Sequence, residues 1–327
     1  MRQPTYLSPS SIKTFLKSRE EYYLQYLADE RPPKFPQTKP MAVGAAFDAY
    51  IKHHLVKMLQ GNVPEQFEFD NIFETQVEEQ NREWAKEHGF YLFKCYKDSG
   101  ALARLMTELE QASSMPKFEF TVEQRVAHET CITGVPLLGK PDVFFMNKVG
   151  KPVILDWKVN GYCSKNRTVA RKGYIWYLGQ PSYNHNQAHK DACPMMVDGL
   201  IINVATPLED VNQDWAEQLS IYLWVLGQPI GVDATVGIDQ LCGQGATEDS
   251  YTPIGIAQHR CKISKDFQKK WFAQIVLVWK MIESGNLFPE LTEEERRIKE
   301  QQLNDYYKAF KGDSQNQEWY NKMMGRK

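Results

Sequence analysis

The chain has 327 residues, which is enough for one large domain or two modest ones with a substantial hydrophobic core. With 42% hydrophobic and 24% charged residues, the composition excludes a disordered or fibrous protein and is typical of a globular one. The net charge of −2 at pH 7 excludes a uniformly basic protein that coats nucleic acid, although a local basic groove would still permit DNA binding.

The first third of the chain predicts a layer of helices. Either Ser8 or Ser10 can cap a first helix within residues 5–30. Four prolines at residues 31–40 predict a loop, and apolar residues at helical spacing predict a second helix at about residues 41–59. Two more polar helices are expected at residues 71–88 and 101–112.

The pattern changes at Lys117 to the alternation that is typical of strands. One strand is expected from residue 118 to 126, and residues 131–136 suggest a hairpin. Two further strands are expected at residues 138–146 and 151–158, joined by a turn.

The rest of the chain mixes strands with helices. After an irregular segment, the sequence predicts a strand at residues 197–205, a helix at 214–226, a Gly-rich loop at 228–250, a strand at 251–262 and a helix at 264–284. Thr292 and Glu295 form a capping box for a last helix.

These elements predict an α/β (α+β) protein in which helices flank a mixed central β-sheet. We expect a helical region at residues 1–116 that packs on the core and a core at 117–230 with an insertion at 159–196. The strand and helices of residues 231–327 are expected to belong to the same domain as the core.

Asp142, Asp156 and Lys158 form the constellation with the clearest chemistry. Asp142 follows Pro141, and the segment 153–156 delivers Asp156 from a buried strand to its exposed end. If the two strands pair as a hairpin, both carboxylates project into one pocket, and Lys158 shares the strand face of Asp156. A solvated surface hairpin is the plain alternative for the same pattern.

This set of side chains suits phosphodiester hydrolysis. Carboxylates bind Mg²⁺ through oxygen, and the metal lowers the pKa of a bound water. The carbonyl of Trp157 could supply a further ligand. A lysine beside them can position the attacking water or stabilise developing negative charge.

Four separated segments resemble, in the same order, motifs of the PD-(D/E)xK nuclease superfamily, in its RecB-like exonuclease branch of the phage type. They are similar to an N-terminal helix, a Gly-x-x-x-His helix, the PD-(D/E)xK strands and a Gln-x-x-x-Tyr helix. The matching residues are 8–15 with 22–27, 43–50, 139–142 with 153–158, and 218–222. No single segment is specific, but the ordered set is.

The resemblance implies a restriction-endonuclease-like core with N- and C-terminal helical additions, and Mg²⁺ or Mn²⁺ as cofactor. Asp48 stands where the family has its metal-binding histidine, so the resemblance implies Asp48 as a ligand beside Asp142 and Asp156; an exposed helix charge is the alternative. Glu123 is a candidate for the family's acidic residue before the core strands, or an outward-facing strand carboxylate.

The positions of the cysteines allow two other metal groups, an iron-sulfur cluster and a zinc ion, to be considered. Ser18 stands near the place where some relatives have the first cysteine of an iron-sulfur cluster, and no late trio of cysteines exists, so no cluster is expected. His185, His189 and Cys193 are spaced as zinc ligands on one helix face could be, with Cys163 as a further candidate. Ordinary packing of these residues is favoured over zinc.

Two groups of residues are candidates for DNA contacts. Gln218 and Tyr222 are four residues apart and share a helix face; by resemblance they contact DNA or brace the active site, and plain helix packing is the alternative for Tyr222. The segment 159–190 has no acidic residue and interleaves aromatics with basic residues, which suits phosphates and unpaired bases. Its candidates are Lys165, Arg167, Arg171 and Lys172.

We therefore expect a metal-dependent DNA nuclease, an exonuclease that acts at DNA ends in recombination, repair or phage DNA processing. The alternative is a catalytically weak or inactive DNA-binding accessory protein on the same fold. A single-strand annealing protein or a helicase is the expected partner, since the chain has no phosphate-binding loop. Scattered cysteines, no signal peptide and no membrane-spanning apolar run predict the cytoplasm, of the host if the protein is phage-encoded.

Overall fold

The computed structural model describes the parts of the chain whose positions are defined. They are residues 3–29, 36–129, 131–164, 175–177, 180–181, 194–197, 200–203, 207–232, 234–243, 245–247, 251 and 254–309. No helix in these ranges is both long enough and apolar enough to span a membrane.

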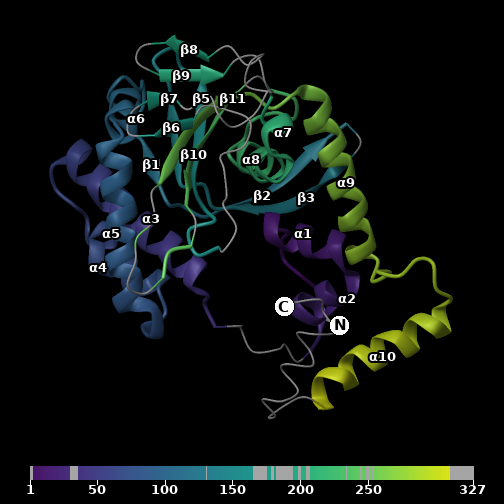
Figure 1. The fold of residues 1–327 in the computed structure, drawn as a ribbon. Helices are drawn as coiled ribbons and strands as arrows, with labels where there is room; N and C mark the ends of the chain where they lie inside the picture. The colour runs from purple at the N-terminus through teal and green to yellow at the C-terminus, as the bar shows by residue number, and fades with distance from the viewer. Residues whose placement is uncertain are drawn as a thin grey trace.

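A seven-stranded mixed sheet forms the centre of the described structure (Figure 1). Its spatial order is β1 (Lys117–Phe118), β4 (Val143–Met146), β5 (Pro152–Asn160), β10 (Thr235–Cys242), β11 (Gly255–Cys261), β6 (Ile175–Tyr177) and β7 (Gln180–Pro181). The β5–β10 pair is parallel, and the other neighbouring pairs are antiparallel. Two separate hairpins join β2 (Val122–His128) to β3 (Cys131–Gly139) and β8 (Pro194–Val197) to β9 (Leu200–Asn203).

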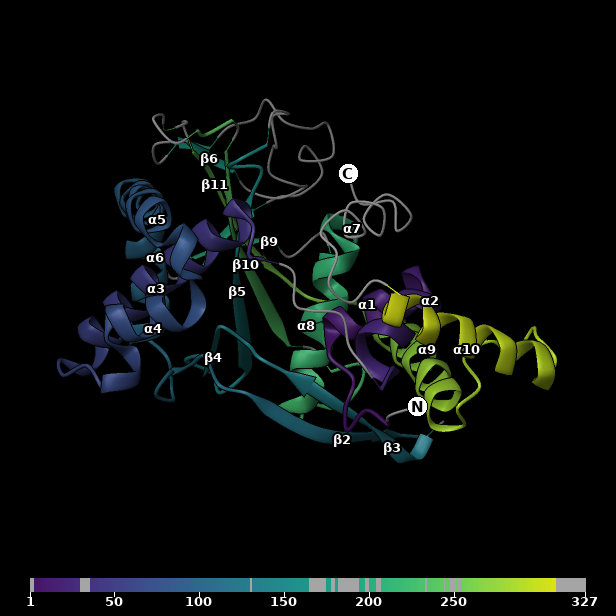
Figure 2. The same ribbon diagram turned by 90° about the horizontal axis from the view of Figure 1, so that it is seen from below.

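Helices cover both faces of this sheet (Figure 1). One layer contains α3 (Lys39–Gln60), η2 (Glu65–Phe67), α4 (Phe69–Gln76), η3 (Glu79–Asn81), α5 (Arg82–Asp98) and α6 (Ala101–Glu110). The opposite side carries α1 (Pro9–Lys17), α2 (Arg19–Tyr22), η1 (Tyr23–Leu27), α7 (Leu208–Val211), α8 (Gln213–Val225), α9 (Lys265–Glu283) and α10 (Glu293–Ala309). Figure 2 shows the sheet between the two layers, with the β2–β3 hairpin extending from it towards α9.

Side-chain alternation along β5 decides which residues face which layer. Val153, Leu155 and Trp157 are buried in a core with residues of α3, α5 and α6. Ile154 belongs to the other core, with residues of α1, α8 and α9. Asp156 and Lys158 share the parity of Ile154, so β5 directs them to the side of the sheet that α8 covers.

Several elements confirm the sequence patterns. Ser8, and not Ser10, caps α1: its hydroxyl accepts from the Ser11 N–H at 3.2 Å, and Ser11 Oγ accepts from the Ser8 N–H at 2.8 Å. The second helix spans Lys39–Gln60, close to the predicted 41–59. The Thr292–Glu295 capping box begins α10, with the Thr292 N–H donating to Glu295 Oε2 at 2.9 Å.

The prediction of a single strand at residues 118–126 is wrong. The chain breaks after β1, because Glu119 adopts a left-handed backbone with φ of 39°, and β2 then joins a different sheet. The expected strand at 138–146 is also interrupted: β3 ends at Gly139 and β4 begins at Val143. Pro141 lies in this break, as expected for a residue without an N–H to donate to a strand ladder.

The predicted loop at residues 228–250 is wrong over β10, which lies at the centre of the sheet. Every residue of β10 after Thr235 is buried. Gly237 and the polar residues Asp239 and Gln240 conceal the strand pattern in the sequence. Their polar groups are satisfied by residues that are distant in sequence, including Arg260 and Asn160.

Candidate active site

The β4–β5 pair brings the two core carboxylates together. Val143 lies opposite Leu155, so the next position in this antiparallel register sets Asp142 opposite Asp156. Asp142 Oδ2 accepts a hydrogen bond from the Trp157 backbone N–H at 3.0 Å. Asp156 is 3% exposed and forms an ion pair with Lys158. The hairpin that was expected around Asp142 and Asp156 is therefore present in the fold.

Helix α3 delivers Asp48 to the same place, together with a residue that the sequence analysis did not single out. Lys52 is one helical turn after Asp48, and its side chain is only 2% exposed. Its ammonium group lies 2.6 Å from Asp48 Oδ2, 3.2 Å from Glu119 Oε2 and 3.4 Å from Asp142 Oδ1. Three separate segments of the chain thus meet at one buried lysine.

Glu119 is the second residue that the sequence analysis missed. It lies in the break after β1, where its N–H donates to the Asp142 carbonyl at 3.1 Å. Its carboxylate accepts from Gln76 Nε2 at 2.8 and 2.9 Å and pairs with Lys140. A left-handed φ is uncommon for glutamate and is kept here by these contacts. In the sequence, Glu119 stands between Phe118 and Phe120, and this acidic residue between two apolar ones was the signal that could have indicated a buried role.

Glu123, the acidic residue that was predicted to assist the site, lies elsewhere. It is exposed on β2 opposite Leu138, and it lines neither of the cavities described below. Because the chain changes sheets between β1 and β2, the turn at Glu119 brings that residue to the centre and carries Glu123 away from it.

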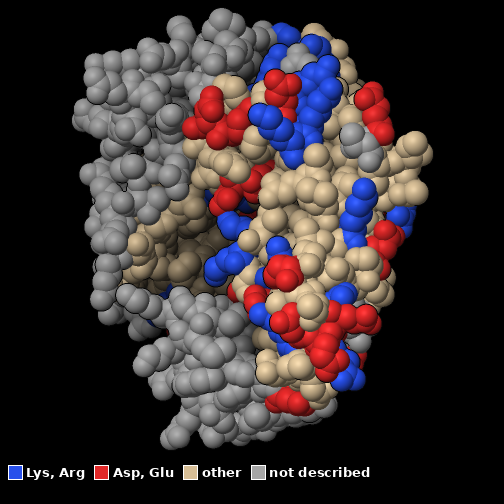
Figure 3. Space-filling model, turned by 90° about the vertical axis from the view of Figure 1, so that its right-hand side faces the viewer, with Lys and Arg blue, Asp and Glu red and all other residues tan. Residues whose placement is uncertain are grey.

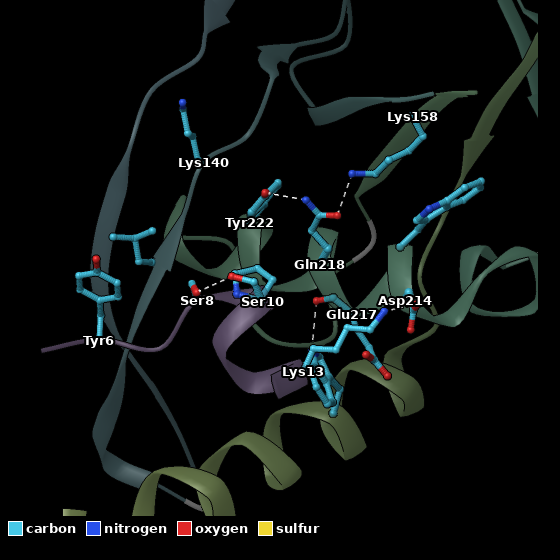
Figure 4. A pocket seen from close by; sticks show the side chains of 14 residues that line it. Tyr6, Ser8, Ser10, Lys13, Lys140, Lys158, Asp214, Glu217, Gln218 and Tyr222 are labelled. Carbon is cyan, nitrogen blue, oxygen red and sulfur yellow. Dashed lines mark hydrogen bonds and ion pairs between the residues drawn. The ribbon is translucent and has the colours of Figure 1, made fainter. Parts of the chain in front are cut away.

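Helix α8 carries Gln218 and Tyr222, which are linked to Lys158 of β5 (Figure 4). Lys158 Nζ donates to Gln218 Oε1 at 3.0 Å, and Gln218 Nε2 donates to the Tyr222 hydroxyl at 2.7 Å. A Cβ atom on Gly139 would come within 2.9 Å of the Tyr222 ring and 2.8 Å of Val225. Gly139 therefore permits the close packing of β3 on α8 that places Gln218 beside Lys158.

Two adjoining cavities meet at these residues. The smaller, of about 290 Å³, is lined by Asp48, Asp142 and Asp156. The larger, of about 550 Å³, extends along the start of α1 and the outer side of α8. Both cavities are lined by Lys140, Lys158, Gln218 and Tyr222.

The wider surface carries both signs of charge. In Figure 3, the described surface around the hollow intersperses Lys and Arg with Asp and Glu, and it forms no continuous basic face. Lys13 lines the larger cavity and is paired with Asp214 at 2.5 Å. Any attraction of a polyanion on this face is therefore local to the cavities, as the overall charge predicts.

Burial and neighbouring charges divide the carboxylates into two classes. Burial raises the pKa of Asp48 to about 7 and that of Asp156 to about 7, although a lysine beside each opposes the shift. Burial also acts on Asp142, but the ammonium groups of Lys52 and Lys158 outweigh it and keep the pKa of Asp142 below its usual value. Lys52 and Lys140 have the same effect on the pKa of Glu119.

The donors fit a divalent metal by their chemistry. Asp48, Asp142 and Asp156 present hard carboxylate oxygens to one cavity, which is the ligand type that Mg²⁺ and Mn²⁺ prefer. Within the described ranges, no three His, Cys, Asp or Glu side chains converge closely enough to form a metal site as they stand. The lysine ammonium groups compensate the carboxylates instead.

Several predicted site residues lie outside the described part of the chain. They are the DNA-contact candidates Lys165, Arg167, Arg171 and Lys172 and the zinc candidates His185, His189 and Cys193. Cys163, the further zinc candidate, is described and packs against the core that contains α3, α5 and α6.

Of the comparisons with known proteins, the match to a protein family agrees with the geometry. No curated protein matches this chain. The solved structure of SSO0001 is 11% identical and covers 81% of this chain and 85% of its own, with a TM-score of 0.23, which is too low to support an argument. Residues 6–176, more than half of the chain, match the PD-(D/E)XK nuclease superfamily. They include Asp48, Asp142, Asp156 and Lys158, and the chain belongs to the PD-(D/E)XK nuclease superfamily.

Proposed function

We propose that this protein is a Mg²⁺- or Mn²⁺-dependent deoxyribonuclease that hydrolyses phosphodiester bonds at DNA ends. The observation that carries the proposal is the meeting of two cavities at Lys158 and Gln218. One cavity is lined by Asp48, Asp142 and Asp156, and the other, of about 550 Å³, has the volume for part of a nucleic-acid strand. The RecB-like order of the four sequence motifs supports an exonuclease, with a role in recombination, repair or phage DNA processing.

Asp142 and Asp156 are the central ligands of the proposed metal site, with Asp48 and the Trp157 carbonyl as further ligands. Such an ion, when bound, neutralises charge on the phosphate and lowers the pKa of a bound water. The hydrogen bond from the Trp157 N–H fixes the orientation of Asp142. The break between β3 and β4 frees the Asp142 side chain from the regular alternation of a strand.

Lys158 is the proposed electrostatic catalyst. Asp156 and Gln218 hold its ammonium group at the junction of the cavities, where it can face a phosphate oxygen or the attacking water. Burial lowers the pKa of Lys158, but the carboxylates of Asp156 and Asp142 outweigh this and raise it, so the ammonium stays charged. Tyr222 holds Gln218 in turn and is buried itself.

The larger cavity is the proposed path of the DNA strand. Lys13, Lys140 and Lys158 line it and can contact phosphates. Tyr6 and Trp215 line it as well, and aromatic rings stack on unpaired bases. The basic residues Lys165, Arg167, Arg171 and Lys172 follow Lys158 in the chain, and we include them as DNA contacts on the basis of the sequence.

Cleavage assays on DNA of different topology test this function. The purified protein with Mn²⁺ or Mg²⁺ should degrade end-labelled linear DNA and leave a covalently closed circle intact. Asp142→Ala and Lys158→Ala should abolish degradation, whereas Asp70→Asn, an exposed acid on α4 outside both cavities, should not. Cleavage of the closed circle would overturn the exonuclease assignment, and no cleavage of any DNA would overturn the nuclease.

Two observations favour the second candidate, a DNA-binding accessory protein on the same fold. The described carboxylates do not converge on a metal site, and Asp48 stands in place of the expected histidine. This alternative predicts DNA binding without cleavage. It also predicts that Asp156→Ala leaves the metal affinity unchanged in a calorimetric titration, whereas the nuclease requires that affinity to fall.

A further inference from the structure

Lys52 is a buried cation at the middle of the carboxylates. Its side chain is 2% exposed, and its three ammonium protons face three carboxylates, of Asp48, Glu119 and Asp142. These acids come from α3, the break after β1 and the break before β4. Burying an ammonium group is costly unless its partners satisfy it. Here each partner is itself negatively charged.

The Lys52 ammonium group occupies a position among three carboxylates that a metal cation could otherwise occupy. Asp48, Glu119 and Asp142 are oxygen donors, and each is also partly open to solvent, at 17%, 17% and 21%. Two-metal phosphodiesterases hold two ions a few ångströms apart between shared carboxylates. In this chain the Lys52 ammonium already bridges Asp142 to Asp48 and Glu119.

The two carboxylate oxygens of Asp142 have different partners. Its Oδ1 atom faces Lys52, whereas its Oδ2 atom accepts from the Trp157 N–H beside Asp156. Asp156 is ion-paired with Lys158 instead. The centre therefore has two halves that share Asp142: in one, the Lys52 ammonium contacts three carboxylates, and in the other, Lys158 is ion-paired with Asp156.

We propose that Lys52 takes the place of a second metal ion and restricts this centre to a single divalent ion, with Asp142 and Asp156 as its central ligands. The inference rests on the proposed metal-dependent function and concerns the number of ions that the centre accepts. With every group charged, the four carboxylates of the centre, its two lysines Lys52 and Lys158, and Lys140 beside Glu119 leave one net negative charge. One divalent ion offsets it, and a second would leave a large excess of buried positive charge.

Metal stoichiometry tests this role directly and needs no catalytic activity. Calorimetric titration of the wild type with Mn²⁺ should give one ion per chain, with the paramagnetic resonance spectrum of an isolated Mn²⁺ ion. Lys52→Met keeps the length of the side chain but removes its charge, and it should bind two ions with a spin-coupled spectrum. Lys57→Met makes the same change at an exposed position of α3, and it should bind one ion.

Five outcomes decide the question. Two ions in the wild type, or one ion in folded Lys52→Met, would overturn the role of Lys52. No Mn²⁺ in the wild type would overturn the metal-dependent function as well, so the two failures are distinguishable. Two ions in Lys52→Gln, which keeps amide donors without the charge, would support the proposal if Lys52→Met does not fold. One ion in Lys52→Gln would count against it.

Discussion

Two buried ionic clusters lie on this sheet, and they use the same kinds of charged group for different ends. The first is the centre formed by Asp48, Lys52, Glu119, Asp142, Asp156 and Lys158. The second, which we call the Arg260 cluster, joins α5, α6, β10 and β11 and contains Tyr96, Glu108, Asp239, Gln258 and Arg260.

The Arg260 cluster is closed. Arg260 donates to Glu108 Oε2 at 3.1 Å and to Asp239 Oδ1 at 2.6 Å. The other oxygen of Asp239 accepts from Tyr96 and, at 2.9 Å, from Gln258. Asp239 is 0% exposed and Arg260 is 2% exposed. The planar guanidinium offers several fixed donors, so each of these carboxylates has a partner inside the protein.

The centre is open by contrast. Three of its four carboxylates, those of Asp48, Asp142 and Asp156, line a cavity, and all four are held by lysines, whose ammonium groups are compact charges on flexible stems. Perturbed groups in a cavity mark a site that is available for chemistry, whereas enclosed groups with every partner in place mark structure. Access to solvent, and not the number of buried charges, therefore separates the two roles.

The largest expected effect comes from breaking the open cluster at Asp156. Asp156→Asn keeps the volume but removes a proposed metal ligand, so kcat on linear DNA should fall by about 10³-fold or more. The protein should stay folded, because the substitution removes a buried charge instead of exposing one. Steady-state kinetics beside a thermal melt would check both parts; a variant with near wild-type kcat would contradict the proposed site.

Breaking the closed cluster should give the reverse result. Arg260→Met leaves Asp239 and Glu108 buried without their cation, so the free energy of unfolding should fall by about 3–5 kcal/mol. The activity of the molecules that remain folded should be preserved. Denaturant titration measures the loss. Arg297→Met, at an exposed arginine on α10, is the control, with a change of less than about 1 kcal/mol.

Gln218 is an uncharged residue that supports Lys158, a charged group of the open cluster. Gln218→Ala removes the acceptor that holds Lys158, and we expect kcat to fall by about 10–100-fold with little change in stability. Kinetics and a thermal melt measure the two effects. Tyr222→Phe, which removes only the hydroxyl contact to Gln218, should have a smaller effect; a larger loss would contradict this order.

The smallest effect should come from pH, measured on the metal-free protein with a chelator present. Asp48 and Asp156, whose pKa is about 7 in the fold, bind a proton more tightly folded than unfolded, where aspartate has a pKa of about 3.9. Their contribution to stability is present below pH of about 4 and is lost as the pH rises through about 7. Asp142 and Glu119, whose pKa is lowered in the fold, contribute to stability in the opposite sense, because their contribution is lost as the pH falls into the acid range.

The melting temperature of the metal-free protein should therefore decrease between pH 5 and pH 8. Burial also raises the pKa of Glu108 in the Arg260 cluster, so its contribution has the same sign. Asp48→Asn isolates the centre, because it should make the decrease shallower while it leaves Glu108 intact. An identical slope in Asp48→Asn would show that the centre does not titrate in this range.

Local signals in the sequence determined much of this protein. Apolar spacing and capping residues gave α1, α3, α8, α9 and α10, because helix formation depends on residues a few positions apart. The pairing of Asp142 with Asp156 followed from a short hairpin, and the i,i+4 spacing of Gln218 and Tyr222 followed from one helix.

Tertiary structure alone decided the rest, because the remaining contacts join distant segments. β10 is central only because β5 and β11 satisfy its backbone, and Arg260 and Asn160 satisfy its polar side chains. Glu119 replaced Glu123 at the centre because one left-handed residue sends the chain into another sheet. Lys52 is an ordinary helix lysine in the sequence. The fold makes it a buried cation by bringing Glu119 and Asp142 to within 3.2 and 3.4 Å of its ammonium group.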